Sequence, residues 1–167
     1  SADGAIPLIA LDGKAHIYGT KGHRFMELLR FFLGPGQCDL VGGEILLEIV
    51  IPPLPPRTGG AYIKHGRREA MELPMLGVGV LLSLEEDMQT CARARICLGV
   101  AAPTPLRCFQ AENYLVGKTV DDKTLTETGR LAGEESKVRD SIRGLAWYRR
   151  EMVGVLVKRM GLKALER

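Results

Sequence analysis

The sequence predicts an α+β fold in which helices pack on one face of an antiparallel sheet. Residues 75–84 and 90–100 alternate in character at every second position, which is the period of a strand. The final third changes to helical spacing, most clearly after Leu145. Strands followed by helices, rather than the two in alternation, are typical of α+β proteins.

The first third is expected to form a hairpin and one further strand. Residues 15–18 and 23–27 read as short strands joined by a Gly-Thr-Lys-Gly turn, with a short helix or turn after them. A glycine-rich loop, GPGQCDLVGG, precedes EILLEIVIP, whose aliphatic and β-branched density predicts a mostly buried strand that ends at Pro52. The proline-rich run at 52–60 is then the best candidate for a linker.

The centre of the chain is expected to supply the sheet. Residues 60–64 read as a strand, and the strands at 75–84 and 90–100 are joined by a turn at 85–89. The alternation predicts an inward face made of Leu76, Val78, Val80, Leu82, Leu84, Thr90, Ala92, Ala94, Ile96, Leu98 and Val100. The opposite face, with Cys91, Arg93, Arg95 and Cys97, is expected to be wet.

Three helices are expected in the last third. Residues 105–117 hold a short helix, and Thr124-Leu125-Thr126-Glu127 matches a capping box for a second one, which Gly129 and Gly133 would weaken. The last helix is predicted to bury a stripe made of Tyr148, Met152, Val155, Leu156 and Met160. Its predicted polar side carries Arg149, Arg150, Glu151 and Lys158.

Composition narrows the class of protein. The 167 residues suit one compact unit or two small ones, and 46% hydrophobic with 26% charged residues excludes disordered and fibrous classes. A net charge of +3 and few aromatic residues for base stacking lead us to expect no nucleic-acid partner. We expect no membrane span and a cytoplasmic location, because there is neither a long apolar segment nor a basic leader. The start without Met suggests a piece of a longer polypeptide.

Self-contained catalytic signatures are absent from the sequence. There is no Walker loop, G-x-G-x-x-G, G-x-S-x-G or H-E-x-x-H motif. The four cysteines, Cys38, Cys91, Cys97 and Cys108, lack C-x-x-C spacing, which favours free thiols over a metal site. The histidines, His16, His23 and His65, stand apart in sequence with no marked nucleophile. We therefore assign no catalytic residue and no metal ligand.

The stretch GAYIKHGRRE, at 60–69, concentrates positive charge. Strand alternation places Tyr62 and Lys64 on one face and His65 on the other. A lysine held beside an aromatic ring suits contact with a flavin or nucleotide, and a solvated charge cluster is an equal alternative. Arg67 and Arg68 extend beyond the strand and fit solvated or subunit-facing charge.

Five stretches, taken in order, carry a resemblance to a known family. They are DGAIPLIALDGKAHI, RFMELLRFFLGPGQCDLVGGEILLEIVIP, AYIKHGRREAMELP, ARARICLGVAAPTPLRCFQAENYLVGK and RGLAWYRREMVGVLVKR. Together they resemble the carboxy-terminal part of the FAD-binding medium subunit of molybdenum hydroxylases, the carbon monoxide dehydrogenase and xanthine dehydrogenase family. The resemblance implies that residues 1–56 are the tail of the FAD-binding subdomain and that 57–167 form a CO dehydrogenase flavoprotein C-terminal domain.

The same resemblance implies a function and a set of site residues. FAD in such a subunit takes electrons that arrive from a small [2Fe-2S] subunit, after oxidation at the molybdenum cofactor of a large molybdopterin subunit, and passes them to an acceptor. By position in the motifs, Asp3 is implied as a contact to the flavin or ribityl region, Leu46 as an apolar contact to the ring, and Lys64 as a cation near the ring. The alternative is a non-catalytic docking module of that complex, with Arg93, Arg95 and the last helix at an interface.

The sequence also departs from the family pattern. The amino-terminal glycine-rich loops and the T-I-G-G segment before Asp3 are missing, so the resemblance implies an incomplete FAD site and an inactive isolated chain. Near the end, Asp140 and Arg143 look retained, but the proline of the family's P-I-S-D approach to R-G is absent.

Overall fold

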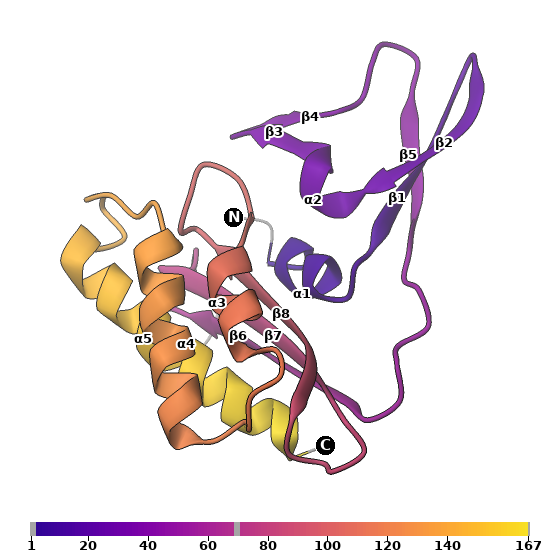
Figure 1. Ribbon diagram of the computed structural model, residues 1–167. Helices are drawn as coiled ribbons and strands as arrows, with labels where there is room; N and C mark the ends of the chain where they lie inside the picture. Colours follow the sequence, from indigo (N-terminus) through magenta and orange to yellow (C-terminus); the bar gives the residue numbers. More distant parts are fainter. Residues whose placement is uncertain (1–2, 69–70, 167) are drawn as a thin grey trace.

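The chain folds around a four-stranded antiparallel sheet. The computed structural model describes residues 3–68 and 71–166. The sheet order is β6 (Thr58–His65), β7 (Leu76–Leu84), β8 (Cys91–Gly99) and β9 (Leu106–Arg107). Three helices, α3 (Phe109–Leu115), α4 (Asp122–Glu135) and α5 (Ala146–Leu165), cover one face, while α1 (Ala5–Ala10) lies on the other (Figure 1). The predicted α+β class is confirmed, and β6 begins inside the predicted linker.

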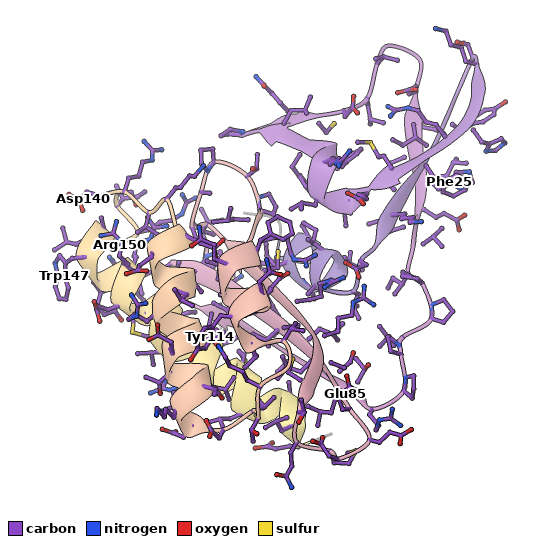
Figure 2. All side chains as sticks on the ribbon, in the orientation of Figure 1. Phe25, Glu85, Tyr114, Asp140, Trp147 and Arg150 are labelled. Carbon is purple, nitrogen blue, oxygen red and sulfur yellow. The ribbon has the colours of Figure 1, made fainter. Side chains whose placement is uncertain are left out.

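A smaller lobe precedes this sheet. It contains a three-stranded sheet in the order β2 (Gly22–Glu27), β1 (Lys14–Gly19), β5 (Ile45–Val50). Between β2 and β5, the chain forms the short helix α2 (Leu28–Phe31) and a hairpin of β3 (Phe32–Gly34) and β4 (Gln37–Cys38). The predicted first hairpin is confirmed, with Tyr18 opposite His23. The prediction that β5 is mostly buried is wrong, since Ile45 is 56% exposed. Among residues 3–68 and 71–166, no helix covers one side of this sheet, and Phe25 projects there (Figure 2).

The main hydrophobic core lies between the four-stranded sheet and helices α3 to α5. Its sheet side includes Leu76, Val78, Val80 and Leu82, as the alternation predicts, and its helix side includes Leu156. Burial of such side chains is the chief source of stability for a unit of this size. This core therefore fixes the helices against the sheet.

The opposite face of the sheet is not wet. All nine residues of β7 are buried, because α1 seats Ile6 over Gly77, Gly79 and Gly99. A Cβ atom at Gly99 would lie 2.7 Å from Ile6 Cγ1, so only glycine leaves room for this approach. No periodic pattern predicts this cover, because α1 has only six residues and includes Pro7.

Cys91 and Cys97 are both buried, for different reasons. The ladder between β7 and β8 shifts between Ser83 and Leu84, which places Cys91 opposite Leu84 and in the main core. Cys97 does lie on the other face, but α1 covers it. Burial raises the pKa of the Cys97 thiol to about 12. Both thiols are thus buried, and the prediction that they share an exposed face is wrong.

Helix α4 begins one turn earlier than predicted. Its N-cap is Asp121, whose carboxylate accepts a hydrogen bond from Thr124 N at 2.7 Å while the Thr124 hydroxyl accepts one from Asp121 N. Gly129 keeps the low helix propensity of glycine, and it permits close contact with Gly154 of α5. The prediction of this helix is therefore confirmed, but the predicted N-cap, Thr124, is wrong.

The buried stripe of α5 is rotated from the predicted one. Leu156 and Met160 are buried as expected, but Val155 is exposed and Arg149 is buried. The helix is buried along Arg149, Val153, Leu156, Val157, Met160, Gly161 and Ala164. Arg149 lies inside because its guanidinium bonds to backbone carbonyls, a pattern that hydrophobic periodicity cannot detect.

The contact between α4 and α5 predicts an asymmetric response to alanine. A Cβ at position 129 would lie 2.4 Å from Gly154 O, whereas a Cβ at position 154 would lie 3.4 Å from Gly129 O. We expect Gly129→Ala to lower the free energy of unfolding by about 1–3 kcal/mol through overpacking, although alanine favours helices. Gly154→Ala, the matched control, should leave it unchanged or slightly higher. Urea unfolding followed by circular dichroism measures both; equal effects would contradict the close packing.

The seat of α1 predicts coupling between two positions. Gly99→Ala and Ile6→Ala should each destabilise the protein, but the double variant should lose less than the sum, by about 0.5–3 kcal/mol, because the smaller side chain accommodates the new methyl group. Gly42→Ala is the control, since nothing lies within 4 Å of a Cβ there, and it should combine additively with Ile6→Ala. Strict additivity of the Gly99 and Ile6 changes would argue against the contact.

Candidate functional site

A cleft of about 730 Å³ lies between the smaller lobe and the four-stranded sheet. One wall is the β3–β4 hairpin, the floor includes Ile6 of α1 and Gly77 and Gly99 of the sheet, and the far wall comes from segments 100–105 and 137–143. Its volume falls in the range of pockets that hold cofactors and small ligands. The Gly34-Pro35-Gly36 segment is the turn of the hairpin, as the sequence favours, and it lines the cleft.

The structure brings two of the three implied cofactor contacts together. Lys64 Nζ lies 2.7 Å from Asp3 Oδ2, joining residues that are 61 positions apart in the sequence. Asp3 lines the cleft, immediately before α1, and Lys64 reaches it from β6 on the α1 side of the sheet. The pair is partly exposed, so solvent screens its attraction. The main effect of the ion pair is to position the two side chains, because each charge holds the other beside the cleft.

Tyr62 adds a hydroxyl to this end of the cleft. Its side chain lies across Gly77, whose missing Cβ would be 3.5 Å from Tyr62 Oη. Tyr62 Oη is buried and has no hydrogen-bond partner among the described residues. Burial, and then the Asp3 carboxylate, raise the pKa of Tyr62, so the phenol stays protonated and able to donate. Sequence alternation placed Tyr62 with Lys64 correctly, but it gave no reason to expect an unpaired hydroxyl.

Leu46 lies elsewhere. It belongs to β5, opposite Ile17 of β1, and is 37% exposed. It does not line the cleft, and its strand is in a different sheet from Lys64. The described residues therefore join Asp3 and Lys64 without Leu46.

The far wall carries a group of four cations that no sequence motif predicts. Lys137, Arg139 and Arg143 come from the connection between α4 and α5, and Arg149 comes from the first turns of α5. Arg143 Nε is buried and unpartnered among the described residues. Burial, and then the neighbouring Arg143 and Arg139, lower the pKa of Arg149. No periodic pattern marks such a loop, so only the folded chain reveals the cluster.

Arg93 and Arg95 are engaged within the chain. Both side chains contact the carboxylate of Asp12, which follows α1, and Arg107 also approaches Asp12 at 3.3 Å. Arg107 in turn forms a buried pair with Glu112, with 2.6 Å between Arg107 Nε and Glu112 Oε1. Arg93 and Arg95 are therefore partly exposed and also tie β8 to the end of α1, and their contact with another subunit stays a prediction.

Other clusters carry no metal chemistry within the described ranges. His16 contacts both Glu48 and His23, at 2.8 and 2.9 Å, so the first hairpin unites two histidines that are separate in sequence. Across residues 3–68 and 71–166, no group of three or more His, Cys, Asp or Glu side chains is placed to hold a metal ion. The helices of these ranges are also too short or too polar to cross a bilayer.

The cleft combines groups suited to a flat ligand with polar edges and a negative charge. Ile6 and Phe32 offer apolar surface, the Tyr62 hydroxyl and Arg143 Nε are unused hydrogen-bonding groups, and Asp3 offers an acceptor. A flavin has an apolar ring system with hydrogen-bonding groups at its edge, so these residues fit part of FAD.

Known proteins similar to this chain are dehydrogenases and oxidoreductases or their subunits. The putative xanthine dehydrogenase FAD-binding subunit of Escherichia coli K12 is 31% identical over 96% of this chain and 54% of its own length. Carbon monoxide dehydrogenase from Oligotropha carboxidovorans superposes with a TM-score of 0.89 at 28% identity, over 98% of this chain and 56% of the matched one. Quinoline 2-oxidoreductase from Pseudomonas putida 86 gives 0.86 at 26%, over 97% and 55%. The chain thus spans about half the length of these relatives.

The sequence of the sheet and helices also matches a defined domain family. The match covers residues 61–164 and therefore includes nearly all of β6 to α5. It agrees with the resemblance seen in the sequence and with the fold of the structural relatives. The chain belongs to the CO dehydrogenase flavoprotein C-terminal domain family.

Proposed function

We propose that this chain is the carboxy-terminal part of the flavoprotein subunit of a molybdenum hydroxylase and that its cleft receives part of FAD. The observation that carries the proposal is the pair of buried, unpartnered polar atoms in the cleft, Tyr62 Oη and Arg143 Nε. Buried polar groups are normally hydrogen-bonded, so bound groups that pair with these two atoms explain them. The FAD-binding relatives, which match nearly the whole chain, support FAD as the ligand of the Tyr62 hydroxyl.

FAD, when bound, supplies the redox chemistry by accepting electrons and passing them on. The chain supplies position and charge. Asp3 orients Lys64 at the cleft, the Tyr62 hydroxyl is available to donate to a ring-edge acceptor, and Ile6 and Phe32 exclude water from the floor and one wall. We also propose that Leu46 makes an apolar contact with a part of FAD that extends outside this cleft.

The proposal extends to organisation and partners. We assign residues 1–56 to the FAD-binding subdomain and 57–167 to the carboxy-terminal domain, in accord with the family match at 61–164. A small iron–sulfur subunit and a large molybdopterin subunit are the proposed partners, in the cytoplasm. Relatives that are named as medium chains, or as a subunit of a dehydrogenase complex, support a multi-subunit assembly.

A docking role is the second candidate function, and one surface favours it. Ile142 is 92% exposed, and Leu145 is also exposed just before α5. Trp147 is exposed in the first turn of α5 (Figure 2). Arg67 Nη2 lies 3.3 Å from Ile142 O and joins the loop after β6 to this surface. Because Arg93 and Arg95 are paired with Asp12, this end of α5 replaces them as the candidate interface.

Tyr62→Phe tests the flavin proposal. Titration of FAD with the chain should quench flavin fluorescence and shift its visible spectrum, and loss of one hydrogen bond of about 1 kcal/mol should weaken binding roughly fivefold. Tyr114→Phe is the matched control, because Tyr114 lies on α3 against Lys118, outside the cleft lining (Figure 2). Equal affinities for the two variants would contradict the role of Tyr62. No spectral change until the amino-terminal half of a relative is added would favour the docking role for this chain.

The Asp3–Lys64 pair predicts opposite shifts of flavin potential in a subunit that holds FAD. Lys64→Met leaves the Asp3 carboxylate uncompensated and should make the potential more negative, whereas Asp3→Asn leaves the lysine cation and should make it more positive. Each shift should be roughly 20–40 mV, since 30 mV corresponds to about 1.4 kcal/mol for a two-electron couple. Lys64→Arg keeps the charge and is the control. Redox titration followed at the flavin absorbance measures all three; an unchanged potential and affinity in Lys64→Met would remove Lys64 from the site.

A further inference from the structure

The cleft has an unequal distribution of charge. Among its described lining residues are four cations, Lys137, Arg139, Arg143 and Arg149, and one carboxylate, Asp3. Asp3 is paired with Lys64, and no ion pair joins it to any of the four among the described residues. The wall formed by the α4–α5 connection and the start of α5 is therefore strongly positive.

Arg149 is the buried member of this wall. It is 3% exposed and donates to three backbone carbonyls, with 3.3 Å from Nε to Met75 O, 2.8 Å from Nη1 to Arg139 O, and a further contact from Nη2 to Val100 O. These carbonyls satisfy its donors without supplying a negative charge. A buried cation with no counter-ion is costly, and the neighbouring guanidinium groups of Arg143 and Arg139 add repulsion.

Arg143 has no comparable structural task among the described residues. Its side-chain Nε is buried beside the cleft without a partner, and only its backbone N–H bonds locally, to Ser141 Oγ at 3.2 Å. The nearest carboxylate along the chain, Asp140, accepts a hydrogen bond from Ala146 N at 2.6 Å and lies on the outer side of this loop (Figure 2). The Arg143 guanidinium, which has a buried donor and no carboxylate partner among the described residues, is therefore able to bind an anion.

We propose that Arg143 and Arg149, with Arg139 and Lys137 at the rim, form an oxyanion site that binds a phosphate group in the cleft. Arginine matches the paired oxygens of phosphate and binds them by charge-assisted hydrogen bonds. The site is separate from the Asp3–Lys64–Tyr62 end, which holds a compensated ion pair and a neutral phenol. The phosphate belongs either to the flavin nucleotide itself or to a second, phosphate-bearing co-substrate that enters the same cleft. The existence of the site stands without the proposed function; the identity of its ligand rests on it.

Binding of inorganic pyrophosphate to the 167-residue chain tests the site. Calorimetric titration should show binding that weakens as salt rises, because ion pairing drives it. Arg143→Gln keeps a polar side chain but removes the charge and the guanidinium donors, and it should weaken pyrophosphate binding at least roughly tenfold. Arg130→Gln is the control, since Arg130 pairs with Glu127 and Glu134 on α4, outside the cleft lining. Arg139→Gln provides a second probe that leaves the carbonyl contacts of Arg149 in place.

Three outcomes are decisive for the oxyanion site. Absent pyrophosphate binding, or equal affinities for Arg143→Gln and the wild type, overturns it. Loss of affinity in both Arg143→Gln and Arg139→Gln, with Arg130→Gln unaffected and with unchanged circular dichroism, supports it. Failure of the flavin proposal looks different, because then neither FAD nor riboflavin binds while pyrophosphate still does.

The two sources of phosphate are separated by competition. If the flavin supplies it, Arg143→Gln should weaken FAD and FMN but not riboflavin, which has no phosphate, and saturating FAD should displace pyrophosphate. If a co-substrate supplies it, pyrophosphate and ADP should still bind in the presence of saturating FAD, and Arg143→Gln should spare FAD. Either pattern supports the site and names its ligand.

Discussion

The seat of α1 on a glycine strip is the constraint from which the rest of the site follows. A six-residue helix is too short to persist by itself, so its order comes from packing. Gly77, Gly79 and Gly99 leave a flat track on two neighbouring strands, and Ile6 fills it. The helix then covers a sheet face that would otherwise be exposed, brings Asp3 to the end of β6, and places the smaller lobe across from the loop at 137–143. Without this contact the cleft would lose its floor.

Ion pairs hold both ends of that helix. Asp3, just before α1, is paired with Lys64 on β6, and Asp12, just after it, is paired with Arg93 and Arg95 on β8. Partly exposed pairs contribute little stability individually, so their effect is chiefly on direction. They fix the rotation and position of a helix that apolar contact alone would leave free to slide. The smaller lobe is thereby fastened to the sheet through charge at two points and through packing between them.

The parts of this structure that repeat regularly were predictable, and the parts that depend on single contacts were not. Alternation at 75–84 gives the faces of β7 correctly, because the strand period of two is a local property. It cannot reveal that α1 covers the second face, since that depends on glycines meeting a distant Ile6. The charge of Arg149 likewise predicts a place on the polar side of α5, but backbone carbonyls from three segments accept its hydrogen bonds and allow its burial. Resemblance supplied Asp3 and Lys64, which no local pattern would have paired.

Arg149 and Arg143 differ in the hydrogen bonds that they make within the fold, and this difference distinguishes a structural residue from a candidate ligand contact. Arg149 offsets part of its desolvation cost by tying together the segments at Met75, Val100 and Arg139, so its burial has a structural reason. Among the described residues, Arg143 has no such hydrogen bonds to offset the burial of its Nε, which is unpartnered. Local features that oppose stability without a visible compensation concentrate at functional sites. Arg143, rather than the more deeply buried Arg149, is therefore the residue of this wall whose presence is best explained by a ligand.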